Sequence, residues 1–181
     1  TGVALPSSSY NTGIGHPQYL CLETPQSFNL KFICFFANLL AFQPQTKADL
    51  QTAVNLWVSD EASALSQYGD INTWDVSLIT DMNSLFYNKS TFNSDISNWD
   101  VSNVTTLRYM FWNATSFNQD ISGWDVSNVT TMHNTFVNTP FNQDLSSWDV
   151  SNVTDMQQMF QGATSFEGTG INNWDVSNVT D

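Results

Sequence analysis

Large apolar residues return at nearly fixed intervals along most of the chain. Successive tryptophans are 25, 25, 24 and 26 residues apart, at Trp74, Trp99, Trp124, Trp148 and Trp174. A phenylalanine follows twelve residues after each of the first four, at Phe86, Phe111, Phe136 and Phe160. This self-similarity indicates tandem repeats of about 25 residues. We predict that these tryptophans and phenylalanines are structural core residues.

Within each unit the apolar spacing changes. Trp74 and Val76 alternate as in a short strand, whereas Met82 followed by Phe86 four residues later suits one or two helical turns. The Ser-Asn residues that follow the strand predict a tight turn. One such unit cannot fold alone, so the units must stack on one another. Residues 71–181 are therefore expected to form stacked coils of strand, turn and short helix, an α/β architecture cut off inside a unit at the C-terminal end.

The segment before the repeats predicts a helical N-terminal cap over residues 46–70. Thr46 and Asp49 resemble a capping box, and the apolar residues after them have helical spacing over about 47–58. Asp60 and Glu61 suit the first turn of a second short helix, which Gly69 would end. Because the first coil of a stack exposes an apolar end, a helical pair there is best explained as a cap.

Residues 1–45 predict a poorly ordered arm that leads into an apolar segment. The apolar run 32–42 is shorter than the roughly 20 residues that cross a bilayer, so no transmembrane span is expected in this chain. The run suits either the remnant of a secretion signal or a helix packed on the end of the stack. Cys21 and Cys34 either pair as a disulfide or are two separate buried thiols.

Charge narrows the range of partners. The chain has four Lys and Arg against 17 Asp and Glu, for a formal net charge of -13. Nucleic acid is excluded as an expected partner because phosphate binding needs clustered basic residues. An anionic membrane surface is disfavoured for the same reason. The surface is instead rich in Asn, Ser, Thr and Gln, which favours an extracellular or cell-surface location.

An aspartate after each tryptophan is the strongest candidate for site chemistry. If layers stack about 4.8 Å apart, these carboxylates either share calcium or accept hydrogen bonds from the next serine in Asx turns. The five are Asp75, Asp100, Asp125, Asp149 and Asp175. Catalysis would need one pair to differ from the rest, as in a glycosidase. Because every unit repeats the same residues, we expect no enzyme and no cofactor other than possible calcium.

Binding is the remaining candidate function. Tyr87, Tyr109 and Trp112 break the repeat pattern in two adjacent units, and aromatic residues on a polar surface are typical binding anchors. The alternative role of these residues is to cover loop edges. Asn88 and Asn113 are the better glycosylation candidates among six sequons, because the other four belong to the repeated Asn-Val-Thr and suit hydrogen bonds inside a turn.

The motifs NWDVSNVT and MF-x-x-AT-SFN-QDIS-x-WDVS resemble the BspA-like leucine-rich-repeat surface proteins, in the branch found in mycoplasma-type surface lipoproteins. The resemblance covers roughly Leu50 to Asp181. It implies a right-handed, leucine-rich-repeat-like solenoid at the cell surface with an adhesive or protein-binding role, and it brings no catalytic residues. The expected function is a non-catalytic module that binds a protein or glycan. The alternatives are a spacer, stiffened by calcium, that displays other domains, and, more remotely, a carbohydrate-active enzyme using stacked aspartates.

Overall fold

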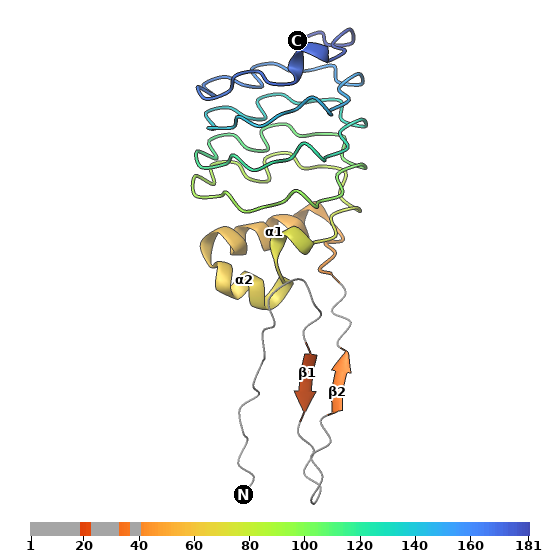
Figure 1. The fold of residues 1–181 in the computed structure, drawn as a ribbon, viewed down its shortest axis with the longest axis vertical. Helices are drawn as coiled ribbons and strands as arrows, with labels where there is room; N and C mark the ends of the chain where they lie inside the picture. Colours follow the sequence, from red (N-terminus) through yellow and green to blue (C-terminus); the bar gives the residue numbers. More distant parts are fainter. Residues whose placement is uncertain (1–18, 23–32, 37–40) are drawn as a thin grey trace, which may run out of the picture. The chain divides into compact units, whose positions relative to one another are not determined.

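The computed structural model describes residues 19–22, 33–36 and 41–181 (Figure 1). The chain divides into two compact units, Thr1–Leu40 and Ala41–Asp181. In the second unit two helices are followed by a stack of irregular loops, one loop for each repeat (Figure 1). Each loop is called a layer below, and the first layer is the one that contains Trp74.

The first unit contains one antiparallel pair of strands, β1 (Tyr19–Leu22) and β2 (Ile33–Phe36). A strand thus occupies part of the apolar run for which a packing helix was one alternative. The register sets Cys21 opposite Cys34. A disulfide between them, one of the two alternatives, stays a prediction. The predicted poorly ordered arm lies largely outside the described residues.

Both predicted helices are present at the start of the second unit. Helix α1 (Lys47–Ser59) begins at a capping box, in which the Thr46 hydroxyl accepts the Asp49 N–H and the Asp49 carboxylate accepts the Thr46 N–H. Helix α2 (Glu61–Tyr68) ends at Gly69, as expected. Helix α1 covers the first layer, because Gln51 Nε2 donates to the carbonyl oxygen of Leu85 at 3.0 Å. Neither helix in the described part of the chain is long and apolar enough to cross a membrane.

Backbone hydrogen bonds join each layer to the next along one arm of the loop. Ser84, Phe86 and Asn88 donate N–H bonds of 2.8–2.9 Å to carbonyl oxygens of the second layer. The intervening N–H groups, of Tyr87 and Lys89 for example, bond three residues back within their own layer. Successive N–H groups thus alternate between a bond to the next layer and a bond within the local turn. The same pattern returns in the second and third layers.

The expected α/β, leucine-rich-repeat-like solenoid of strand–turn–short-helix coils is wrong. Over residues 71–181 the structure has no strand and no α-helix, only the 3₁₀ turns Ile71–Thr73 and Ile171–Asn173 and single parallel bridges between layers. The predicted short helix fails because Ser84 and Asn88 have left-handed backbones, with φ of 61° and 57°. A helix requires negative φ throughout. The predicted strand at Trp74 fails because its N–H bonds Ile71 of its own turn.

Side chains of the period fill the interior. Phe86, Phe111, Phe136 and Phe160 stack ring on ring, with centroids 5.4–5.5 Å apart and planes within 8° of parallel. Trp74, Trp99, Trp124 and Trp148 are buried beside them, and Trp174 is half-buried. The repeat therefore accounts for the core, and the surface residues remain to account for function.

Candidate functional site

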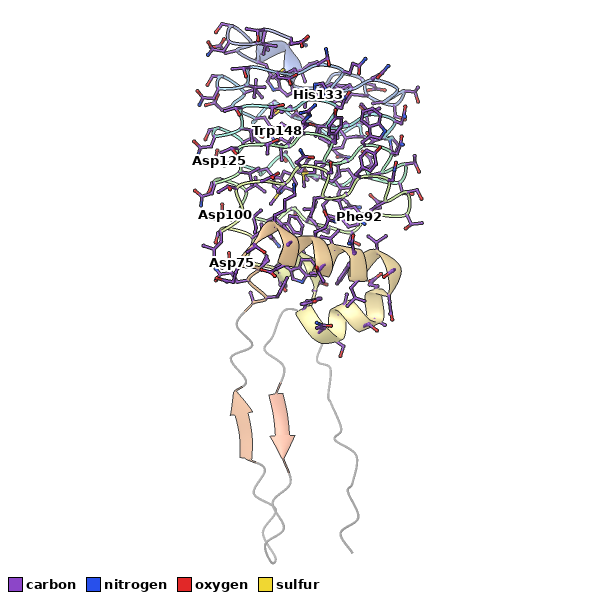
Figure 2. The ribbon with its side chains drawn as sticks, turned by 180° about the vertical axis from the view of Figure 1, so that it is seen from behind. Asp75, Phe92, Asp100, Asp125, His133 and Trp148 are labelled. Atoms are coloured by element: carbon purple, nitrogen blue, oxygen red, sulfur yellow. The ribbon has the colours of Figure 1, made fainter. Side chains whose placement is uncertain are left out.

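The repeated aspartates are occupied by local hydrogen bonds. Figure 2 shows Asp75, Asp100 and Asp125 in successive layers along one edge of the stack. Oδ1 of each of the five accepts the N–H of the serine two residues later, at 3.0–3.1 Å. The serine hydroxyl and N–H lower the pKa of Asp75, Asp125, Asp149 and Asp175. The Asx-turn interpretation is therefore confirmed.

Calcium gains no support from this geometry. In residues 41–181 and the two short strands, no three side chains of His, Cys, Asp or Glu form a group that could hold a metal ion. The charge of Asp149 also acts to raise the pKa of its column neighbours Asp125 and Asp175, although their serine bonds outweigh it. The column is thus a set of separate turns, and we do not propose it as a metal site.

Asparagines of the Asn-Val-Thr motif join neighbouring layers through their side chains. The side-chain amides of Asn103, Asn128 and Asn152 donate to serine carbonyl oxygens of the preceding layer at 2.7–2.9 Å. The first layer has Leu78 at this position. These asparagines are hydrogen-bonded, as predicted, but to the preceding layer and not inside their own turn.

The two favoured glycosylation candidates belong to a different asparagine ladder. Nδ2 of Asn113 donates to Oδ1 of Asn88 at 2.8 Å, and Nδ2 of Asn138 donates to Oδ1 of Asn113 at 2.8 Å. A glycan is attached through Nδ2, so modification of Asn113 would compete with a bond between layers. Asn88 contributes its oxygen to the ladder and is the better of the two candidates.

The three pattern-breaking aromatic residues come together on the surface. The ring of Trp112 lies 6.1 Å from that of Tyr87 and 5.4 Å from that of Tyr109. Tyr87 is 43% exposed, and the other two are half-buried. Because they come from two stacked layers, the ladder of backbone bonds sets their separation.

Three more side chains extend this group, and the sequence did not single them out as site residues. The His133 ring packs edge-on against Tyr109 at 5.3 Å, and its Nδ1 lies 3.2 Å from Oδ1 of Asp155. The guanidinium of Arg108 lies over the Tyr109 ring, 4.8 Å from the centroid. Tyr87, Tyr109, Trp112 and His133 are called the aromatic cluster below. Arg108 and His133 occupy the position nine residues after the tryptophan, where the first and fourth layers have Asn83 and Gln157.

The carboxylate at the edge of the aromatic cluster is held as an anion. Burial by itself raises the pKa of Asp155, but the N–H of Gln157 and the ring of His133 outweigh burial and lower it. Asp155 therefore fixes the position of His133 by a bond that does not depend on the aromatic rings.

A family model described as a Mycoplasma protein of unknown function, DUF285, matches residues 56–151 and 124–181. The chain belongs to this family. No curated protein matches the chain. Comparison with solved structures finds no match. The first DUF285 match begins before the first layer, and the second overlaps it and continues to the last residue. The predicted membership of a mycoplasma-type repeat family is confirmed at this level, and the match does not extend to the BspA-like group.

Tyr109 is an unusual choice for its place in this DUF285 chain. Its φ is 55°, in the left-handed region that glycine and asparagine adopt more readily. The same position holds Ser84, Asn134 and Gln158 in the other layers, all with positive φ. An aromatic side chain does not make this left-handed backbone conformation more favourable. Its contacts with Trp112, His133 and Arg108 are what distinguish it.

One hollow lies away from the aromatic cluster, where the end of α1 meets the first layer. Its lining consists of Trp57, Val58, Ser59, Glu61, Thr91, Phe92 and Ser94. The indole of Trp57 donates to Ser94 Oγ at 2.9 Å, which closes one side. The hollow is lined by a single carboxylate, that of Glu61, so it lacks the pair of carboxylates that a glycosidase needs.

Proposed function

We propose that this DUF285 chain is a non-catalytic binding module, displayed at the cell surface or secreted, whose ligand is a protein or glycan bound at the aromatic cluster. The observation that carries the proposal is a contrast between repeated and non-repeated surface positions. Repeated polar side chains bond within or between layers, whereas the aromatic cluster sits at positions where the layers differ.

The geometry of the cluster supports a binding role. Aromatic residues with arginine are the residue types enriched at binding hot spots. Here Tyr109, Trp112 and His133 are held by three successive contacts that do not need a ligand to form. A surface that is already ordered loses little side-chain entropy on binding.

Composition supports the location. The net charge of -13 and the surface of uncharged polar residues suit an exposed extracellular module. The motif resemblance to BspA-like surface proteins favours adhesion as the biological role.

A binding screen tests the proposal. The protein is applied to a glycan array and to extracellular proteins, in parallel with a variant carrying Tyr109→Ala and Trp112→Ala. Binding by the parent and its loss in the variant are expected. Leu78→Ala is the matched control, because Leu78 is an exposed apolar residue outside the cluster. Equal far-ultraviolet circular dichroism and equal urea midpoints show that the variants fold alike.

Two results would contradict the proposal. Binding that survives in the double variant would place the ligand elsewhere on the surface. No binding to any protein or glycan would favour the alternative role of a spacer, for which the bonds within and between layers would be sufficient.

A further inference from the structure

Arg108 is the only arginine of the chain. Its guanidinium lies 4.8 Å from the Tyr109 ring centroid, and its Nη2 donates to Tyr109 Oη at 3.1 Å. Both contacts hold the guanidinium beside the aromatic cluster. Its side chain is exposed, so its other N–H groups can reach a ligand.

The positive charge of Arg108 is not paired within the described part of the chain. Lys47 pairs with Asp81, and the ring of His133 is hydrogen-bonded to Asp155. Lys89, the other described cation, donates to Asn55 at 2.7 Å. In a protein of net charge -13, an exposed guanidinium without a carboxylate partner is the group best suited to recognise one. Guanidinium and carboxylate form two parallel hydrogen bonds, which a lysine cannot reproduce.

The backbone beside Arg108 argues against a peptide that binds by adding a strand. Peptides that add to a protein surface commonly bond exposed N–H and C=O groups of an edge. Here the N–H groups of Tyr109, Phe111 and Asn113 donate to carbonyl oxygens of the third layer, and those of Met110, Trp112 and Ala114 donate within their own layer. No backbone row is left for an added strand along this stretch.

The rest of the cluster favours a sugar. Trp112 and Tyr87 offer ring surfaces against which the C–H face of a pyranose can pack. Their ring planes are tilted by 37° to each other, so the two rings do not form a single flat surface. Polyanionic chains are disfavoured because 17 acidic residues repel them at longer range. A single acidic sugar avoids most of that repulsion.

We propose that the aromatic cluster binds a glycan through a terminal sugar that carries a carboxylate, of the uronic or sialic acid type. Arg108, held by Tyr109, pairs with the carboxylate, and Trp112 and Tyr87 contact the sugar ring. This inference rests on the proposed function and names the ligand class of the same site.

Matched sugars provide the test. Titration calorimetry compares an oligosaccharide ending in glucuronic acid with the same oligosaccharide ending in glucose, and sialyllactose with lactose. We expect the parent protein to bind at least one acidic sugar about tenfold or more tightly than its neutral counterpart, because hydrogen bonds to charged groups are the stronger ones. Arg108→Gln should remove that preference, and Arg108→Lys should restore only part of it. Higher salt should weaken binding of the acidic sugar alone.

Lys89→Gln is the control, because it removes the same unit of charge from another place on the surface. An equal loss of affinity in Lys89→Gln and Arg108→Gln would assign the effect to net charge and overturn the inference. Equal affinity for acidic and neutral sugars would also overturn it. If Tyr109→Ala with Trp112→Ala abolished that binding while Arg108→Gln did not, the proposed function would stand without the carboxylate. Capture of a protein but no sugar would overturn the inference and leave the binding role intact.

Discussion

The indole Nε1 of Trp99 donates a hydrogen bond of 2.8 Å to the carbonyl oxygen of Ile71, which belongs to the preceding turn of the stack. Trp124, Trp148 and Trp174 repeat this bond to Ile96, Ile121 and Leu145, each at 3.1 Å. Each of these repeated tryptophans therefore packs in the core and also donates a hydrogen bond to the preceding layer. A buried indole N–H needs such a partner.

Replacing one of these tryptophans should weaken the whole stack. Trp124→Phe removes the bond to Ile96 and leaves unfilled volume beside Phe111. We expect the free energy of unfolding to fall by about 1–3 kcal/mol, measured by urea denaturation. Trp112→Phe, in the surface cluster, should change it by less than about 0.5 kcal/mol. Equal losses in the two variants would mean that the indole bond between layers contributes nothing measurable.

Gly162 occupies the place in the fourth layer that Asn88, Asn113 and Asn138 hold in the others. Its φ is 70°, and an added Cβ would overlap Oδ1 of Asn138. Gly162→Ala should therefore lower the free energy of unfolding by about 1–3 kcal/mol, since both backbone strain and the clash act against it. Gly123→Ala is the matched control, because a Cβ there meets no atom within 4 Å. A thermal melt of each variant decides, and similar midpoints for the two would contradict the prediction.

Gln158 is an exposed residue with φ of 55°, a strained conformation for a residue with a Cβ. Gln158→Gly should raise the free energy of unfolding by up to about 1 kcal/mol, because glycine adopts this conformation without strain. Gln161→Gly, three residues away with no positive φ, should lower it by about 0.5–1 kcal/mol. Urea midpoints of both variants measure the difference. Two changes of the same sign would show that strain at Gln158 is not what limits stability.

Acid should destabilise the fold through its Asx turns. The pKa values of Asp125 and Asp149 are lowered in the folded protein by the hydroxyl and N–H of the serine that follows. A lowered native pKa gives stability that is present above the unfolded pKa of about 3.9 and is lost as pH falls through the native value. The melting temperature should thus hold at neutral pH and fall below about pH 4.

Asparagine substitutions isolate this effect from the relief of net negative charge, which acts in the opposite direction. Asp125→Asn with Asp149→Asn keeps the acceptor oxygens and removes two titrating groups, so melting temperatures between pH 2 and 7 should depend less on pH. Glu167→Gln is the control, because its backbone N–H and not its side chain makes the contact with Asn142. Identical acid profiles for the parent and the double variant would contradict the explanation.

The sequence predicted the core and the helical start well because both depend on local or strictly periodic signals. Thr46 and Asp49 make the capping box that their spacing indicates, and Gly69 ends α2. The columns of Trp and Phe are buried as their period suggests, except at the C-terminal end, where Phe160 and Trp174 are half-buried.

The conformation of the layers could not be predicted because two structures satisfy the same apolar spacing. Met82 and Phe86 reach the interior from one helical turn or from two successive turns with a left-handed residue between them. The choice is made by bonds to the next layer, such as that from Ser84 to Arg108. Those bonds depend on residues 24 positions away, which a local period does not include.

The surface group was predicted in part. Tyr87, Tyr109 and Trp112 stood out as exceptions to the repeat, and they do meet. The pairing of His133 with Asp155 was not predicted because the two residues occupy different positions of their units and meet only across layers. When the units are aligned on their tryptophans, His133 and Arg108 occupy the same position in neighbouring layers.

The asparagine ladder through Asn88, Asn113 and Asn138 has a consequence for how this protein can change in length. Each rung bonds only the rung on either side, so duplication of one unit in the gene would add a rung of the same kind and break none. The molecule would grow by about the 5.5 Å that separates Phe111 from Phe136. Recombination between repeats could thus adjust the length of the stack while its cross-section stays the same.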